Sequence, residues 1–308
     1  KALKQALEAA ERELVDHMPY EIIRRNNLCS LRYAIKNIHN PEDREALERS
    51  GRRLAFDEAL GYALAMYIQK EDRRQNRSFV IQKPDMAAFS SFLPFELTGA
   101  QKKVISQIEE DMCAGTDSPP MSRVVIGDVG CGKTICAAAA MYIAAKGGRQ
   151  AALMAPTEIL AKQHYNDLAP LFAKMGIECA LLTGSTKASV KKSIKKALSG
   201  ASPLPVVIGT HALLTEDVDF ARLGLVITDE QHRFGVMQRA ALGEKGRGVH
   251  VLVMSATPIP RTLTLALYGD LDVSKIDEMP PGRQRVSTYT VDESYRDRLY
   301  GFIRKQVD

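Results

Sequence analysis

Between about Phe92 and Pro280 the sequence alternates short apolar runs with longer helical stretches. The apolar runs have the length of strands, and most are bounded by Gly, Pro, Thr or Asp; they are Val124–Ile126, Ala151–Met154, Cys179–Leu182, Val206–Ile208, Leu225–Thr228 and Val251–Met254. The helical stretches are Thr134–Lys146, Glu158–Lys174 and Lys187–Leu198. This alternation predicts an α/β domain with a mostly parallel central sheet and helices on both faces. Such a sheet places its ligand site at the carboxyl ends of the strands.

A glycine-rich segment directly follows the first apolar run. It consists of Gly127, Asp128, Val129, Gly130, Cys131, Gly132, Lys133 and Thr134. This order fits the phosphate-loop pattern G-x-x-x-x-G-K-[ST] and opens an alanine-rich helix, which is the setting that the pattern requires. Backbone N–H groups of such a loop wrap a phosphate, and the helix N-terminus adds partial positive charge. We expect Lys133 to reach the β- and γ-phosphates of a nucleotide and the Thr134 hydroxyl to hold Mg²⁺.

Two carboxylates, Asp229 and Glu230, stand at the end of the run Leu225–Thr228. The interval between Lys133 and Asp229 is long enough for about three crossovers of roughly 30 residues each. Both motifs can therefore reach the same edge of the sheet. We expect Asp229 to bind Mg²⁺, directly or through water, and Glu230 to orient and deprotonate the attacking water. The pair predicts hydrolysis of the bound nucleotide.

Composition sets weaker limits on the function. Net charge is +5, from 42 basic and 37 acidic residues, which permits a phosphate-backbone partner without demanding one. The 5 cysteines are scattered and form no CxxC pair, which indicates reduced thiols of a cytosolic protein rather than a zinc site or a disulfide framework. No apolar stretch reaches the roughly 18 residues of a membrane span, so we expect no membrane association.

The segment Asp229–His232 resembles motif II of the superfamily 2 helicases. Five more segments resemble motifs of that group and occur in its order: the Q motif, motif Ia, the element after it, motif Ib or Ic, and motif III, at Leu97–Gln101, Ala155–Glu158, Thr183–Gly184, Gly209–His211 and Ser255–Pro258. The resemblance implies a RecA-like P-loop NTPase domain that uses ATP. It also implies that Gln101 pairs with the edge of adenine and that His232 belongs to the catalytic residues.

The same resemblance implies a path for DNA. It runs over Pro156 and Thr157, over Gly209, Thr210 and His211, and over Arg233. Backbone N–H and hydroxyl groups can bind phosphate there without reading base sequence. A buried core histidine is the alternative interpretation of His211.

Longer segments narrow the resemblance to the RecG family and its relative, the transcription-repair coupling factor family. These segments are Asp229–Gly235 and Thr257–Leu263. Gln231 after Glu230, and the segment Leu271–Arg283, favour RecG. This implies an ATP-dependent DNA helicase or translocase that remodels branched double-stranded DNA (forks, Holliday junctions and R-loops) in recombination and repair. A coupling-factor-type motor and a nucleotide-gated DNA-binding module remain as alternatives, although Glu230 argues against the second.

The resemblance also implies a domain order. Residues 1–91 are expected to be a helical region linking a missing wedge domain to the motor, with a break at Asn40-Pro41 and an apolar face over Leu60–Ile68. Residues 92–280 form the ATP-binding domain. Residues 281–308 are expected to hold a linker and the start of a truncated second RecA-like domain, with a strand over Val286–Val291 and a helix over Tyr295–Val307. We expect a monomer in the bacterial cytosol or nucleoid, and a fragment that hydrolyses ATP poorly and does not unwind DNA.

Overall fold

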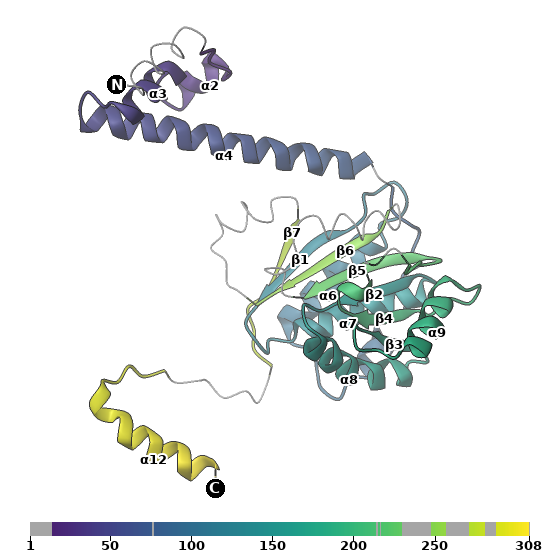
Figure 1. Ribbon diagram of the computed structural model, residues 1–308. Coiled ribbons are helices and arrows are strands. Elements are labelled where there is room, and N and C mark those ends of the chain that lie inside the picture. The colour runs from purple at the N-terminus through teal and green to yellow at the C-terminus, as the bar shows by residue number, and fades with distance from the viewer. Residues whose placement is uncertain are drawn as a thin grey trace.

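The chain is organised around one parallel sheet, seen in a computed structural model (Figure 1). The structure describes residues 14–75, 77–213, 215, 217–229, 248–256, 271–280 and 288–307, without the side chains of residues 66, 69, 70 and 72–75. The sheet has seven strands in the order β3-β4-β2-β5-β6-β1-β7, and all paired strands are parallel. This confirms the predicted α/β class with a parallel central sheet. No helix in the described ranges combines the length and the apolar character needed to cross a membrane.

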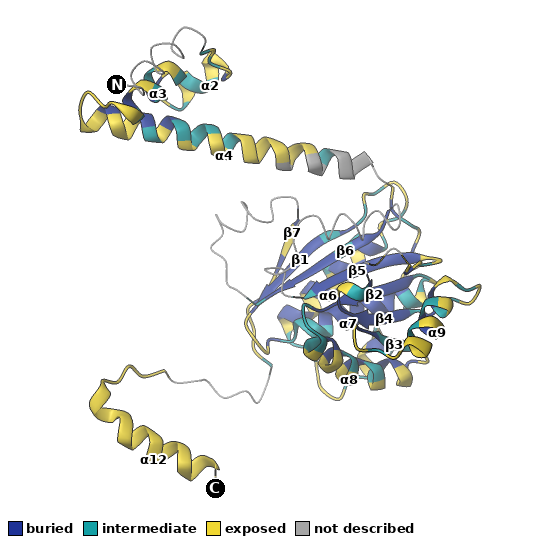
Figure 2. Cartoon of the chain, in the orientation of Figure 1, coloured by how far each residue is buried: buried dark blue, intermediate teal, exposed yellow. Residues whose placement is uncertain are grey.

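Six of the seven strands coincide with the predicted apolar runs. The strands are β1 (Ser122–Gly127), β2 (Gln150–Met154), β3 (Cys179–Leu182), β4 (Val206–Gly209), β5 (Leu223–Asp229), β6 (His250–Ser255) and β7 (Asp272–Ile276). Strand β7, which was not predicted, pairs with β1 at one edge of the sheet. The central strands β1, β2, β4 and β5 are almost entirely buried (Figure 2).

Helices cover both faces of the sheet, as predicted. The helices of this domain are α5 (Met86–Ser91), α6 (Gly99–Met112), α7 (Lys133–Lys146), α8 (Glu158–Lys174) and α9 (Ala188–Ser199), with a 3₁₀ turn at His211–Leu213. On one face, Val125 and its neighbours pack against α6, α7 and α8. On the other face, Ala152 and its neighbours pack against α9. Ala137–Ala140 and Ala144 of α7 are fully buried, because small side chains let this helix lie close to the sheet.

The N-terminal region is helical, as expected. It contains α2 (Tyr20–Arg25), α3 (Leu31–His39) and the long helix α4 (Arg44–Gln75), which extends away from the small helices in Figure 1. The break at Asn40-Pro41 lies between α3 and α4. Leu64, Tyr67 and Ile68 lie on α4, but each is more than half exposed. The predicted apolar face of this helix is therefore not covered by the described part of the chain.

A buried arginine joins the N-terminal helices. The Arg53 side chain is 1% exposed and pairs with Asp16 at 2.6 Å and with Asp57 at 3.1 Å. Its Nη1 also donates to the carbonyl oxygen of Cys29 at 2.8 Å. The hydrogen bond from Arg53 holds the pKa of Asp16 at about 2. These contacts tie α4 to two chain segments that precede it.

The segment after α4 packs against the end of the sheet at which the strands begin, called here the amino edge. Ser78 N donates to Ser118 O at 3.2 Å, and Ser78 Oγ lies 3.1 Å from His250 Nε2. Met121 N donates to His250 Nδ1 at 2.9 Å. Because Nδ1 accepts, the imidazole is neutral and carries its proton on Nε2. Burial lowers the pKa of His250 to about 4, with a further contribution from the charge of Arg149.

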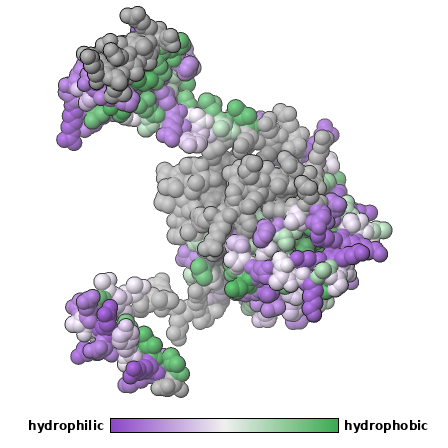
Figure 3. Space-filling model, viewed as in Figure 1, coloured by the Kyte–Doolittle hydropathy of each residue, from purple (hydrophilic) through white to green (hydrophobic). Residues whose placement is uncertain are grey.

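The C-terminal segment stands apart from the sheet in Figure 1. Helix α12 (Arg296–Val307) agrees with the predicted helix, and no residue in it is buried. Leu299, Phe302 and Ile303 are exposed and form part of its apolar side, visible in Figure 3. The predicted strand over Val286–Val291 is wrong where the structure describes it, since residues 288–291 are not in a strand. Pro281 and Gly282 of the predicted linker lie outside the described residues.

Candidate active site

The phosphate loop connects β1 to α7 at the end of the sheet where the strands finish, called here the carboxyl edge. Gly130 and Gly132 have φ values of +81° and +92°, a backbone region that favours glycine. The Lys133 ammonium donates to the carbonyl oxygens of Gly127 at 2.7 Å and Asp128 at 3.0 Å, so it lies inside the curve of the loop. The strand, loop and helix expected around this motif are therefore all present.

The start of α7 suits an anion. Gly132 is the N-cap residue, and no side chain caps it within the described residues. The first N–H groups of a helix need acceptors from outside the helix, and a phosphate supplies them. Asp128, Val129 and Gly130 are exposed, so the loop is open to solvent. Thr134 lies in the first turn of α7, next to Lys133. The loop thus fits a triphosphate, and the Mg²⁺ contact of the Thr134 hydroxyl stays a prediction.

Asp229 lies at the same edge, two strands away. It is in register with Met254 of β6, which is in register with Val125 of β1. Neighbouring strands are about 4.8 Å apart, so the Asp229 and Val125 backbones are about 10 Å apart. The phosphate loop begins two residues after Val125. A phosphate group with its metal ion spans such a distance, so the position of Asp229 fits the predicted Mg²⁺ ligand.

Sequence reasoning missed His164, which contacts Asp229. Its Nε2 lies 2.6 Å from Asp229 Oδ2, and the two side chains are 9% and 14% exposed. His164 belongs to the buried stripe of α8, together with Ala161, Leu168 and Phe172. The available signal was a histidine at helical spacing on an otherwise apolar stripe, but only the fold shows that it faces Asp229.

Gln101 supports the phosphate loop directly. Its Nε2 donates to Cys131 O at 2.8 Å, and its Oε1 accepts from Thr98 N at 2.9 Å within a capping box at the start of α6. The side chain is buried, and a Cβ on Gly132 would overlap its amide nitrogen. The contact with the loop was not predicted. The contact between Gln101 and adenine stays a prediction, and the amide keeps one N–H and one lone pair for it.

Two of the predicted DNA segments lie at the ends of neighbouring strands, since Pro156 and Thr157 follow β2 and Gly209 ends β4. Thr183 and Gly184, which resemble the element after motif Ia, follow β3 on the other side of β4. Thr157 caps α8 by accepting from Leu160 N at 3.3 Å. The loop after β3 is bound to the start of α8, because Glu158 accepts from Ser185 N at 2.9 Å and Ser185 Oγ at 2.5 Å. These hydrogen bonds lower the pKa of Glu158.

The residues after β4 differ in exposure. His211 is exposed, so the alternative interpretation as a core histidine is wrong. Thr210 is 1% exposed, and its backbone N–H donates to Leu182 O. Gly209 passes so close to the Leu182 carbonyl that a Cβ would overlap it. Of the three, His211 is the residue whose side chain is exposed to solvent, while the other two shape the strand end.

Three predicted site residues lie outside the described residues, namely Glu230, His232 and Arg233, and so does the Thr257-Pro258 end of motif III. Their predicted roles therefore stay predictions. Ser255, where motif III begins, is described and lies buried at the end of β6.

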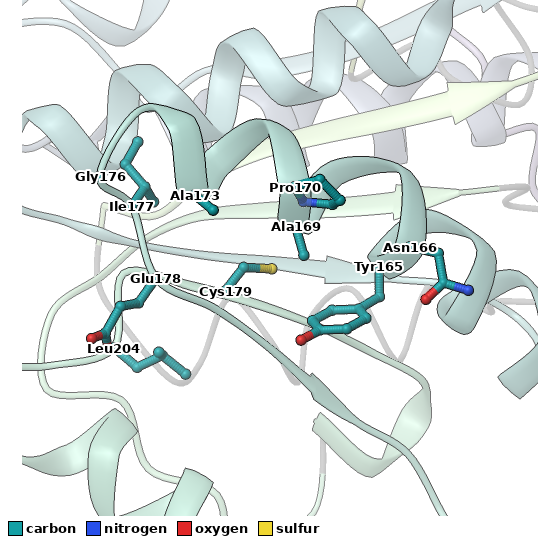
Figure 4. Close-up of a pocket in the computed structure, with 10 residues that line it drawn as sticks. All are labelled: Tyr165, Asn166, Ala169, Pro170, Ala173, Gly176, Ile177, Glu178, Cys179 and Leu204. Atoms are coloured by element: carbon teal, nitrogen blue, oxygen red, sulfur yellow. The ribbon is translucent and has the colours of Figure 1, made fainter.

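A cavity of about 810 Å³ lies elsewhere, between α8 and the start of β3 (Figure 4). Its lining includes Tyr165, Pro170, Ile177 and Cys179. Burial raises the pKa of the Cys179 thiol to about 12, so this group stays protonated. Cys179 begins β3, which places the cavity near the amino edge and away from the phosphate loop.

Comparison with known proteins agrees with this geometry. ATP-dependent DNA helicase RecG from Synechocystis sp. is 47% identical over 306 residues, covering 98% of this chain and 36% of that protein. RecG from Bacillus subtilis is 43% identical, covering 99% of this chain and 45% of that protein. A solved structure described as RecG bound to a three-way DNA junction aligns with a TM-score of 0.80 and 42% identity, over 96% of this chain and 39% of that one.

The chain thus spans less than half the length of these relatives. Residues 98–265, more than half of the chain, match the DEAD/DEAH box helicase family from the capping threonine of α6 past motif III. With the phosphate loop and Asp229 at one sheet edge, the chain belongs to the DEAD/DEAH box helicase family.

Proposed function

We propose that this chain carries the ATP-binding motor of a RecG-like, ATP-dependent DNA helicase. Residues 92–280 form the RecA-like ATP-binding domain in this proposal. The observation that carries it is the phosphate loop at the same sheet edge as Asp229, followed by a helix N-terminus that no described side chain caps. Similarity to RecG over nearly the whole chain supports the same conclusion.

Each residue of the site has a separate task in this proposal. The loop from Gly127 to Thr134 binds the triphosphate through backbone N–H groups, and Lys133 places positive charge at the β- and γ-phosphates. Thr134 and Asp229 hold Mg²⁺, which when bound neutralises charge on the phosphate oxygens. Glu230 orients the attacking water and accepts its proton, with His232 two positions later in the sequence. Gln101 supports the loop and selects adenine.

Branched double-stranded DNA is the proposed partner. The support is the similarity to a structure of RecG on a three-way junction, together with the segments that follow the neighbouring strands β2 and β4. Pro156, Thr157, Gly209, Thr210, His211 and Arg233 are the proposed contacts. Because such contacts are made to phosphate groups, they bind DNA without reading its base sequence. Remodelling of forks, Holliday junctions and R-loops in recombination and repair follows from the RecG similarity alone.

The domain order is also a proposal. Residues 1–91 link the motor to a wedge domain, and residues 281–308 lead into a second RecA-like domain whose arginines complete the ATP site. An arginine finger is worth roughly 10³–10⁵ in rate, so the chain alone hydrolyses ATP slowly and does not unwind DNA. We further propose a monomer located in the bacterial cytosol.

Phosphate release tests the proposal in a longer protein that contains this chain. We expect a three-way junction to stimulate hydrolysis more strongly than linear duplex of the same length. Lys133→Ala should abolish the hydrolysis while circular dichroism stays unchanged. The proposed function would be contradicted if DNA did not stimulate ATP hydrolysis, or if the Lys133→Ala protein still hydrolysed ATP.

A further inference from the structure

We propose that His164 is a positioning residue that fixes the orientation of the Asp229 carboxylate for Mg²⁺. The observation is the 2.6 Å contact between His164 Nε2 and Asp229 Oδ2, made by a helix that belongs to neither the phosphate loop nor motif II. The inference rests on the proposed function, because it takes Asp229 as the Mg²⁺ ligand.

Packing of α8 holds His164 in place. Ala161, His164, Leu168 and Phe172 recur at helical spacing and are all buried against the sheet. The helix begins at the Thr157 cap, and the Glu158 carboxylate adds two hydrogen bonds to the next loop. The imidazole is therefore carried by an element that is anchored at its start and along its buried face.

The chemistry of the contact assigns the donor. An ionised carboxylate only accepts hydrogen bonds, so Nε2 carries the proton and donates to Oδ2. Within the described part of the chain, Oδ1 has no hydrogen-bond partner, and the Asp229 side chain is 14% exposed. One oxygen is thus held by the helix and the other is left for the metal or its water.

Groups that hold a metal ligand in place set the affinity of the site. Their removal typically costs 10–100-fold in metal affinity or activity. Without the His164 bond, the Asp229 carboxylate can rotate about its side-chain torsions and must be ordered when the metal binds. We therefore expect His164 to affect metal binding more than binding of metal-free nucleotide.

Mn²⁺ titration followed by electron paramagnetic resonance provides a readout that is separate from turnover. The probe is Mn²⁺ with a non-hydrolysable ATP analogue, bound to the longer protein. We expect His164→Ala to raise the apparent Mn²⁺ dissociation constant about 10–100-fold. His164→Gln should bind Mn²⁺ nearly as wild type, because its amide nitrogen reaches about as far as Nε2. His164→Asn, one bond shorter, should behave like His164→Ala.

Two controls separate the possible failures. His250→Gln changes another buried histidine, at the amino edge, and should leave Mn²⁺ affinity unchanged. Asp229→Asn should weaken Mn²⁺ binding; if it does not, the metal assignment of the proposed function is wrong. If Asp229→Asn weakens binding but His164→Ala does not, the role of His164 alone is overturned. Failure of a folded His164→Gln protein to restore affinity would overturn it as well.

Discussion

The two edges of the parallel sheet both carry polar groups, but they use them differently. At the amino edge, Gln150 donates to Leu198 O and Leu204 O and accepts from Arg222 N, all within 3.0 Å. His250 is likewise bonded on both ring nitrogens. At the carboxyl edge, the phosphate loop is exposed and the start of α7 has no side-chain cap in the described residues.

This difference indicates that polar groups at the amino edge stabilise the fold, whereas those at the carboxyl edge serve function. Buried polar groups need partners, because an unmade hydrogen bond costs about 1–3 kcal/mol. The amino edge meets that need within the chain and therefore holds the preceding segment in place. The carboxyl edge keeps donors oriented toward solvent, where a ligand can accept from them. Changes at the first edge should affect stability, and changes at the second should affect nucleotide use.

The largest expected effect is at the carboxyl edge. Lys133→Ala removes the charge placed at the phosphates, and loss of one such group costs about 10²–10³ in rate. We expect the steady-state ATPase of the longer protein to fall by at least that factor. Thermal melting should change little, because among the described residues the ammonium bonds only to carbonyls of its own loop. A large drop in melting temperature would show that Lys133 is structural.

At the amino edge, acid should destabilise the fold through His250. Its pKa is about 4 in the folded chain against an ordinary value of 6.5, so below pH 6.5 the unfolded chain binds a proton that the folded chain rejects. The free energy of unfolding should fall by about 3 kcal/mol between pH 6.5 and 4 from this group. Urea titrations of wild type and His250→Gln test this. Equal pH dependence in both proteins would contradict it.

Comparison of two glycines measures how much the packing around the phosphate loop contributes to ATP binding. Gly132 and Gly115 have φ of +92° and +90°, but a Cβ on Gly132 overlaps Gln101 while a Cβ on Gly115 meets nothing within 4 Å. Both alanine variants should lose about 1–2 kcal/mol of stability from the left-handed backbone. Only Gly132→Ala should weaken ATP binding, by about tenfold, or 1.4 kcal/mol. Equal ATP affinities, measured by calorimetry, would refute this.

The smallest expected effect concerns the base of the nucleotide. Gln101→Ala removes the bond to Cys131 O, which should weaken binding of every nucleoside triphosphate. If the amide also contacts adenine, the KM for ATP should rise several-fold more than the KM for GTP, since a neutral hydrogen bond contributes about 1 kcal/mol. If the KM values for ATP and GTP rise equally, Gln101 supports the phosphate loop but does not contact adenine.

Sequence patterns predicted the six strands that are continuous apolar runs, including the half-buried strand β3 at the end of the sheet. Cys179–Leu182 and Glu158–Lys174 agree with the structure at both ends. Strand β7 was missed because buried and exposed residues alternate along this outer strand. Ser274 and Ile276 are buried, and the other three residues are exposed. Ser274 is bonded to Arg123 and Gln107 rather than packed among apolar groups. A search for apolar runs does not detect such a strand.

The phosphate loop and Asp229 were also predicted, because their motifs are continuous in sequence. The bonds from Gln101 to Cys131 and from His164 to Asp229 join residues 30 and 65 positions apart. Each depends on how a helix packs beside the sheet. No local pattern specifies that packing, so the supporting residues of the site became visible only in the fold.

Hydrogen–deuterium exchange with and without an ATP analogue and Mg²⁺ tests the difference between the edges most directly. We predict protection of amides in Gly127–Thr134 and at the end of β5. We predict no change in the segment 77–81 or around His250. Protection that is confined to the amino edge, or absent from the phosphate loop at saturating nucleotide, would contradict the account.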